Sequence, residues 1–495
     1  MENKETAPLP RLPLELFERW NALNLAYCHW KGNSKLARGL RGETDLDIYL
    51  SPKDREQGEA VLREKNFLFC RTQLGAELPE VYDWVGMDPD TGILLHVHLH
   101  YQLVTGRKGV REYTLPWAEE ALESAVADPA TGVKVMDPSL ELIQRWIRVP
   151  LERSSRSVWK ARLKHAFRLT DKESLDLAYL RSAADRERTE ALLTRLFKQP
   201  EPLRALLWKE KLNAAEFLSL RAWAKKELKP CRRGSAASAA WQAARLSLAL
   251  KARALAGKVF HAVLIRRKVP AEGPGRLITF IGQDGSGKTT VTREITRWLS
   301  WKMDARTFYL GAGKQYHSLW NTLIRRLKKY RKIGPVNAMV GVFTALDCVS
   351  IAKHGWKNLN RALCFVEKGG IALTDRFPQT LVRGYNDGPR IRESVMKKVP
   401  GALRGAFGLL AAREEKYVAR SAAIQPDLVF KLMLTPEESM RRKPGELLEG
   451  VRRKHEFIKT WNPGKKTLEI DATQDYAQEL LIIRREIWSC LLQDR

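Results

Sequence analysis

The pattern of apolar and polar positions divides the chain into three parts. Alternating or short apolar runs, which predict strands, occur up to residue 137 and again from residue 274. Between 138 and 273 apolar residues recur at spacings of three and four among many charges, as in surface helices. At 495 residues the chain is too long for one hydrophobic core. We therefore expect three domains: 1–137, 138–273 and 274–495.

The last part shows apolar runs followed by helical patterns. Strands are predicted at Leu277–Ile281, Arg306–Gly313, Gly369–Phe377, Pro426–Leu434 and Lys466–Asp471. Helical patterns occur at Thr289–Trp301, Thr435–Lys443 and Tyr476–Leu492. Strands that alternate with helices predict an α/β domain with a doubly wound parallel sheet.

The first of these strands runs into a glycine-rich segment, GQDGSGKTT, which matches the phosphate-loop pattern GxxxxGK[ST]. Glycines let backbone N–H groups surround phosphate oxygens, and the following helix presents its positive end to them. Lys288 is expected to reach the β and γ phosphates, and Thr289 to hold Mg²⁺ through its hydroxyl. The sequence thus predicts ATP and magnesium as cofactors. The expected nucleotide-binding residues are Gly282, Asp284, Gly285, Ser286, Gly287, Lys288, Thr289 and Thr290.

Charged residues follow the later strands of this predicted sheet. Asp375 and Arg376 close one strand at the edge that carries the phosphate loop, where Asp375 can hold Mg²⁺ and Arg376 can clamp an acceptor phosphate. Arg442 ends a helical segment and can offset negative charge in the transition state. The expected catalytic set is Lys288, Asp284, Asp375, Arg376 and Arg442.

The first part carries two carboxylates on one strand face. Leu12–Leu23 reads as an amphipathic helix, and Thr44–Leu50 alternates as a strand. Alternation puts Asp45 and Asp47 on the same face, close enough to share a divalent cation. The alternative is a strand face that is simply exposed to water.

A second alternating segment, Gly92–Val104, places three histidines on one face: His96, His98 and His100. If this strand lies beside the first, His98 can join Asp45 and Asp47 around one metal ion. Histidines on a sheet surface are more often structural or exposed, and we favour that interpretation.

The formal net charge of +29 indicates an anionic partner: nucleotide, nucleic acid, phosphorylated glycan or membrane lipid. More than half of this excess lies in 151–275. Within it, Ala236–Lys268 is a basic amphipathic segment that can lie on an anionic membrane surface or pack on a neighbouring domain, the commoner outcome. No RNA- or DNA-binding motif accompanies the charge, so nucleic acid is the less expected partner.

Other features favour a cytoplasmic protein, with the inner face of the membrane as an alternative place of attachment. The six cysteines form no CxxC pair, which argues for a reducing compartment. The first residues lack the apolar core of a signal peptide. The longest apolar segment, Pro335–Ala352, contains Asn337 and Asp347 and is short for a membrane span, so we expect a core helix.

The C-terminal part resembles the thymidylate kinase family of P-loop nucleoside monophosphate kinases. The resemblance covers Pro274–Arg495 and rests on DGSGKTT at 284–290, DRF at 375–377 and PDLVFKLMLTPEESMRR at 426–442. It implies that Asp284 lies near the acceptor and that Arg376 contacts the acceptor phosphate. Two positions depart from the family: Ile281 stands where a glutamate is usual, and Cys348 where an arginine is usual. The loss of a charged phosphate clamp weakens the prediction of thymidylate as the acceptor.

Residues 20–110 resemble the polymerase-beta-like nucleotidyltransferase superfamily. Gly32 and Ser34 match its small-residue turn, and Asp45 and Asp47 match its Asp-x-Asp strand. The superfamily often adds a third carboxylate on a later strand, where this chain offers His98. Because Mg²⁺ prefers oxygen ligands, the missing acid weakens two-metal nucleotidyl transfer. Binding of a nucleotide or sugar phosphate without transfer is the alternative.

Together these patterns predict an ATP- and Mg²⁺-dependent phosphotransferase with a small-molecule phosphate acceptor. The acceptor is a nucleoside monophosphate or a sugar or sugar phosphate, and the pairing of domains fits surface-polysaccharide or sugar-nucleotide metabolism by analogy. The alternative is a nucleotide-dependent regulatory or assembly protein that docks on membrane or nucleic acid. The sequence does not fix the oligomeric state.

Overall fold

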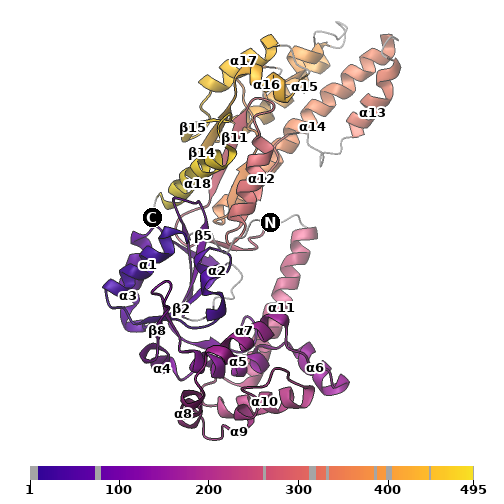
Figure 1. Ribbon diagram of the computed structural model, residues 1–495. Coiled ribbons are helices and arrows are strands. Elements are labelled where there is room, and N and C mark those ends of the chain that lie inside the picture. The colour runs from indigo at the N-terminus through magenta and orange to yellow at the C-terminus, as the bar shows by residue number, and fades with distance from the viewer. Residues whose placement is uncertain are drawn as a thin grey trace. The chain divides into compact units, whose positions relative to one another are not determined.

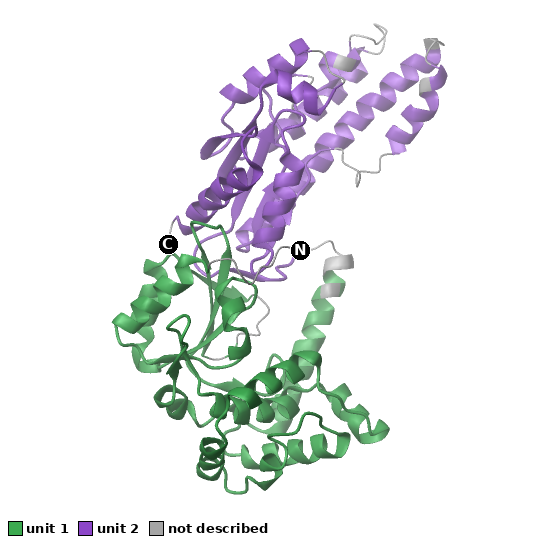
Figure 2. Cartoon of the chain, viewed as in Figure 1, with its two compact units in different colours: residues 1–262 green, residues 263–495 purple. Residues whose placement is uncertain are grey.

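The computed structural model describes residues 9–493 except 73–77, 79, 260–262, 312–318, 331–333, 384–386, 397–403 and 445–447. The chain separates into two compact units, 1–262 and 263–495 (Figures 1 and 2). The expected N-terminal domain and most of the basic helical segment fall in the first unit. The three-part division remains a prediction.

A mixed sheet forms the first part of the first unit, with strands in the order β3-β4-β5-β2-β1-β9-β8. Its central strands β2 and β5 are parallel, and β4 is antiparallel to β5. The register places Asp47 of β2 and Asp83 of β4 on either side of His98 of β5. The strands are β1 Tyr27–His29, β2 Leu46–Leu50, β3 Leu68–Thr72, β4 Val81–Met87, β5 Leu94–His100, β8 Val126–Ala127 and β9 Lys134–Val135. A separate ribbon pairs β6 Val104–Thr105 with β7 Tyr113–Thr114.

Alternation along β2 and β5 sorts apolar from polar side chains, as the sequence predicted. Ile48 and Val97 are fully buried in one core cluster with Trp20 of helix α1. The opposite face of the two strands therefore carries Asp47 and the histidines of β5. The helices of this part are α1 Arg11–Ala22, α2 Leu36–Leu40, α3 Arg55–Glu64 and α4 Ala118–Glu123.

A helical bundle completes the first unit. Helix α5 begins where Asp137 accepts hydrogen bonds from the backbone N–H groups of Ser139 and Leu140, and it buries Ile143 and Trp146 completely. Around it lie helices of the predicted basic segment. The bundle comprises α5 Pro138–Glu152, α6 Ser155–Lys164, α7 Asp171–Ala183, α8 Arg186–Leu196, α9 Glu201–Arg204, α10 Ala214–Glu227 and α11 Ala236–Val259.

Helix α11 corresponds to the expected amphipathic segment Ala236–Lys268 but is described only as far as Val259. Residues 260–262 lie outside the described part, and Lys268 begins strand β10, Lys268–Pro270. The side chains of Trp241 and Leu248 are 62% and 69% exposed. The choice between packing on a neighbouring domain and lying on a membrane surface stays a prediction.

The second unit contains the predicted parallel sheet. Its strands lie in the order β12-β13-β11-β14-β15, and each neighbouring pair is parallel. This confirms an α/β fold with a parallel sheet and places the phosphate-loop strand in the middle. The strands are β11 Arg276–Gly282, β12 Ala305–Thr307, β13 Ile371–Thr374, β14 Leu428–Met433 and β15 Lys466–Asp471. The end of the predicted strand segment Arg306–Gly313, residues 312 and 313, lies outside the described residues.

Helix α14 is longer and less buried than the core helix we expected at Pro335–Ala352 (Figure 1). Among the described residues it is long and apolar enough to cross a membrane by length and composition, and 17% of its most apolar window is buried. Helix α14 packs against helices α13 and α15. The helices of this unit are α12 Lys288–Leu299, α13 Leu319–Leu327, α14 Gly334–Glu367, α15 Arg404–Ala422, α16 Pro436–Arg442, α17 Leu448–Thr460 and α18 Tyr476–Leu492.

Candidate functional site

The glycines of the phosphate loop are required by its backbone. Gly285 and Gly287 have φ angles of +84°, a left-handed conformation that other residues rarely adopt. A Cβ atom on Gly282 would lie 2.5 Å from the carbonyl oxygen of Leu432 on β14. Helix α12 begins at Lys288, directly after Gly287, so its free N–H groups face the loop. The loop therefore has the form of an anion-binding site.

Lys288 lies over this loop. Its Nζ atom donates hydrogen bonds to the carbonyl oxygens of Gly282 at 2.9 Å and Gln283 at 2.6 Å. Burial lowers the pKa of Lys288 to about 8, although Asp284 nearby opposes that shift. A bound phosphate would stabilise the charged ammonium in the same way that Asp284 does.

Thr289 and Asp375, the two residues that the sequence predicted as magnesium ligands in this unit, lie next to each other. The Thr289 hydroxyl donates to Asp375 Oδ2 at 3.1 Å. Asp375 follows β13, which pairs directly with β11, and its side chain is only 6% exposed. Its other oxygen, Oδ1, is buried and has no hydrogen-bond partner in the described part of the chain. A hydroxyl and a buried carboxylate oxygen with a vacant lone pair fit Mg²⁺, which prefers such ligands.

Arg376 is held by a carboxylate that the sequence did not reveal. Its Nη1 atom donates to Asp387 Oδ1 at 3.1 Å, and its guanidinium lies 4.7 Å from the ring centre of Tyr309. Burial opposes the charge of Arg376, but Asp387 and its neighbours outweigh it and raise the pKa. Asp387 itself has a φ of +61°, which is unusual for a residue other than glycine.

Asp284 and Arg442 lie beside the loop in different surroundings. Asp284 contacts Lys443 Nζ at 3.3 Å and Lys454 Nζ at 3.8 Å. Arg442 donates instead to Glu438 Oε1 at 2.7 Å and to the carbonyl oxygen of Ala472 at 3.2 Å. The cavity over the loop is lined by Lys454 of α17, which sequence reasoning missed, and Arg442 is not among the described residues that line it.

Two neighbouring cavities meet at Arg376. The first, of about 250 Å³, is lined by Gly282, Lys288 and Asp375 among others. The second, of about 220 Å³, lies against Tyr309 and Cys348. Both are also lined by Arg376, Asp387 and Arg390. A ligand in the second cavity would therefore border one on the phosphate loop.

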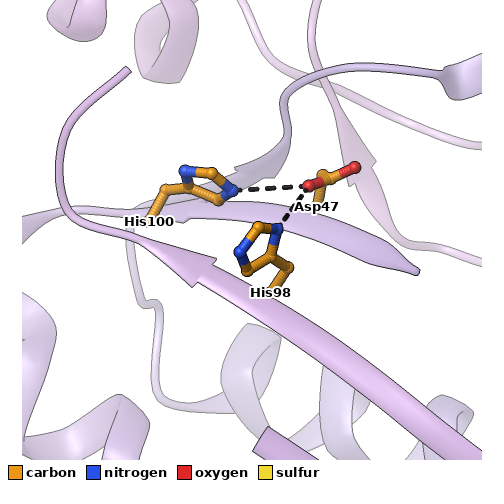
Figure 3. A group of neighbouring side chains, drawn as sticks. All are labelled: Asp47, His98 and His100. Carbon is orange, nitrogen blue, oxygen red and sulfur yellow. Dashed lines mark hydrogen bonds and ion pairs between the residues drawn. The ribbon is translucent and has the colours of Figure 1, made fainter. Parts of the chain in front are cut away.

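The polar sheet face of the first unit also brings Asp47 together with His98 and His100 (Figure 3). Asp47 Oδ1 lies 3.0 Å from His98 Nδ1, 3.4 Å from His100 Nε2 and 2.8 Å from Lys31 Nζ. One donor atom from each of Asp47, His98 and His100 lies within 4.8 Å of the others, which suits a metal ion. The Lys31 ammonium, however, already compensates the Asp47 charge. Burial, followed by the charge of Lys31, holds the pKa of His100 well below its usual value.

The expected ligand Asp45 lies beside a different histidine. His96 Nδ1 is 2.7 Å from Asp45 Oδ1, and His96 Nε2 is 2.9 Å from Asp83 Oδ1. Asp83 supplies the third carboxylate that sequence reasoning did not find. The sequence gives little indication of this role, because a single aspartate in Val81–Met87 can be assigned to the cluster only once the pairing of β4 with β5 is known.

The turn at Gly32 and Ser34, which the sequence matched to the small-residue turn of nucleotidyltransferases, is hydrogen-bonded to the protein's own carboxylates. Glu141 Oε1 accepts hydrogen bonds from the backbone N–H of Gly32 at 2.6 Å and of Asn33 at 3.4 Å. The Ser34 hydroxyl donates to Asp176 Oδ1 at 2.9 Å. Burial raises the pKa of Glu141 to about 7. The resemblance to nucleotidyltransferases therefore stays a prediction.

Comparisons with known proteins place this chain among uncharacterised relatives. No family model matches it. It is 28% identical over 221 residues to the uncharacterized ATP-binding protein YghS of Escherichia coli K12, a match that covers 42% of this chain and 90% of YghS. It is 26% identical over 221 residues to the uncharacterized ATP-binding protein YghR of the same strain, covering 42% of this chain and 84% of YghR.

Among solved structures, a deoxyadenosine kinase from M. mycoides with bound dCMP and dCDP aligns with 15% identity and a TM-score of 0.25. The alignment covers 43% of this chain and 99% of that kinase. In this chain itself, a phosphate loop lies on the central strand of a parallel sheet, with Asp375 at the end of the adjacent strand. This is the arrangement of a P-loop nucleotide-binding domain.

Proposed function

We propose that the second unit is an ATP- and Mg²⁺-dependent phosphotransferase that acts on a small molecule. The observation that carries this proposal is the meeting of two cavities at Arg376, one over the phosphate loop and one beyond it. A protein that only bound nucleotide would not need the second cavity. The names of YghS and YghR as ATP-binding proteins support ATP as the donor.

In this proposal, different residues of the first cavity hold different parts of ATP, the phosphate donor. The N–H groups of the loop and the Lys288 ammonium bind phosphate oxygens. Thr289 and Asp375 would hold Mg²⁺, which neutralises charge on the β and γ phosphates when it is bound. Arg376 and Lys454, at the border of this cavity, add positive charge where the transferring group becomes more negative.

The wider role follows by analogy. A phosphotransferase joined to a nucleotidyltransferase-like unit fits sugar activation for sugar-nucleotide or surface-polysaccharide synthesis, in the cytoplasm, because the two reactions are consecutive steps. This part of the proposal rests on the resemblance of residues 20–110 and not on the chemistry of the site.

A second candidate is a nucleotide-dependent regulator that docks on an anionic membrane. The exposed apolar residues of α11 and the long apolar helix α14 favour it. Such a regulator would hydrolyse ATP without an acceptor and would bind vesicles of anionic lipid. A phosphotransferase would show turnover that depends on one acceptor.

The test is transfer of labelled γ-phosphate from ATP with Mg²⁺ to a panel of nucleosides, sugars and their monophosphates. We expect one class of labelled product, and a loss of about 100-fold or more in rate for Lys288→Ala and Arg376→Ala. Lys229→Ala, at an exposed position of the first unit, is the matched control and should keep the wild-type rate. ATP binding by the wild type that Lys288→Ala removes, without any labelled product from any acceptor, would instead support the regulator.

A further inference from the structure

The second cavity contains as many negative as positive side chains. The charged residues among its described lining are Arg376, Arg390, Asp387 and Glu414. Asp387 accepts a hydrogen bond from Arg376 at 3.1 Å. Glu414 accepts hydrogen bonds from the backbone N–H groups of Arg390 at 3.0 Å and Ile391 at 2.9 Å. Among the described residues, the lining of this cavity therefore offers no surplus of positive charge.

A phosphate monoester is a poor ligand for such a cavity. It carries about two negative charges at neutral pH, and it needs cations or several N–H donors to replace its hydration. Arg376 is already engaged with Asp387 and Tyr309. A dianion would also lie close to the carboxylate of Asp387, which repels it.

The other described residues of the lining carry no charge. Apolar side chains include Leu310, Ile351 and Val418. Burial raises the pKa of the Cys348 thiol to about 12, so this side chain is uncharged at neutral pH. A few polar groups among apolar walls are typical of a site for an uncharged small molecule.

Asp387 has the position that an acceptor hydroxyl requires. It lines both cavities and so stands where the γ-phosphate would meet the acceptor. A carboxylate oxygen can accept a hydrogen bond, and a hydroxyl group can donate one. Arg376 donates a hydrogen bond to one oxygen of this carboxylate, Oδ1, and so fixes the side chain at the border of the two cavities.

We propose that the phosphate acceptor is a hydroxyl group of an unphosphorylated, uncharged molecule, and that Asp387 accepts the proton of that hydroxyl. This inference rests on the proposed phosphotransferase function and names its acceptor class. In the step, the hydroxyl oxygen forms a bond to the γ-phosphorus of ATP. The bond between that phosphorus and the β–γ bridging oxygen breaks, ADP leaves with the electron pair, and the hydroxyl proton passes to Asp387.

The experiment uses the full-length protein, γ-labelled ATP and Mg²⁺ with matched pairs of acceptors. Each hexose is compared with its 6-phosphate, and each nucleoside with its 5′-monophosphate. We expect kcat/KM for the productive unphosphorylated member to exceed that of its phosphate by about tenfold or more. Preference for the phosphorylated member, or equal use of both, overturns this inference, but the proposed phosphotransferase function still stands. No transfer to any acceptor overturns the proposed function and this inference with it.

Two variants test the roles of Asp387 and of the uncharged lining at Cys348. Asp387→Asn keeps the size of the side chain and an oxygen for Arg376, and we expect it to lower kcat about 100-fold with little change in ATP affinity. Cys348→Arg adds a cation to the cavity and should shift the preference toward phosphorylated acceptors by about tenfold. Thermal unfolding of both variants shows whether they are folded. A folded Asp387→Asn protein with the wild-type kcat would overturn the role of Asp387.

Discussion

At the scale of single residues, the site depends on charges that the protein holds partly out of water. Lys288 is buried over the phosphate loop. The hydrogen bonds described for its ammonium go to two backbone carbonyl oxygens, those of Gly282 and Gln283. Asp375 keeps a buried oxygen without a hydrogen-bond partner in the described part of the chain. Such arrangements cost folding free energy, so they are expected where a ligand supplies the missing partner.

The depressed pKa of Lys288 makes ATP binding depend on pH. Its pKa of about 8 means that the ammonium is lost as pH rises through 8 in the free protein. Because phosphate binds the charged form, we expect ATP affinity to fall on the order of tenfold between pH 7.5 and 9.5. Titration calorimetry at a series of pH values measures it. Lys288→Arg, which stays charged, is the control and should flatten the profile; an unchanged wild-type affinity would contradict the assignment.

Asp375→Asn tests the metal site. The amide is a weaker magnesium ligand than a carboxylate, so we expect the Mg²⁺ concentration for half-maximal transfer to rise by roughly tenfold and kcat to fall by about 100-fold. Assays at several Mg²⁺ concentrations separate the two effects. ATP binding in the absence of Mg²⁺ should change little, because the loop and Lys288 remain. Wild-type dependence on Mg²⁺ in this variant would place the metal elsewhere.

At the scale of helices and strands, the sequence predicted those elements whose pattern is local. The phosphate-loop strand, expected at Leu277–Ile281, is β11, Arg276–Gly282, and Lys466–Asp471 forms β15 as predicted. Helix α14 was underestimated because Asn337 and Asp347 interrupt the apolar run, although a helix tolerates polar residues on one side.

Residues that meet through strand pairing or loop placement were beyond local reasoning. Asp83 joins the cluster of the first unit because β4 pairs with β5, a register that the pattern of β4 alone does not specify. Asp387 reaches Arg376 from a loop eleven positions further along the chain. The position of the phosphate loop could be predicted because the residues of its motif are consecutive in the sequence.

The contact between helix α5 and the Gly32 turn gives a prediction for stability. The pKa of Glu141 is about 7 in the folded protein, against 4.5 for an ordinary glutamate, so the folded state holds a proton that the unfolded state releases. Stability of the first unit therefore falls as pH rises from about 4.5 to about 7. Urea unfolding at pH 5 and pH 8 measures this change.

Glu141→Gln removes this titration and keeps an oxygen for the turn. We expect the variant to gain stability relative to wild type between pH 5 and pH 8, by an amount on the order of a few kcal/mol. Glu201→Gln, at an exposed position on α9, is the matched control. The same pH dependence in wild type and Glu141→Gln would mean that another group titrates.

At the scale of the whole molecule, the net charge of +29 acts on every anionic ligand. The summed positive potential attracts ATP before any specific contact forms, and dissolved salt screens it. We expect the association rate constant of ATP to fall on the order of tenfold between 50 and 500 mM NaCl, while dissociation changes less. Stopped-flow fluorescence with a labelled ATP measures it. Adenosine, which is uncharged, should associate at a rate independent of salt.

The central place of β11 also bears on when the protein becomes able to bind nucleotide during its synthesis. The loop needs β13 and β14 on either side, and β14 ends at Met433. Sheet contacts between segments so distant in sequence form slowly, and only after the later segment has left the ribosome. Nascent chains that stop before β14 will therefore contain the whole GQDGSGKTT motif without the pocket that it serves. Nucleotide binding marks a late stage in the biogenesis of this chain.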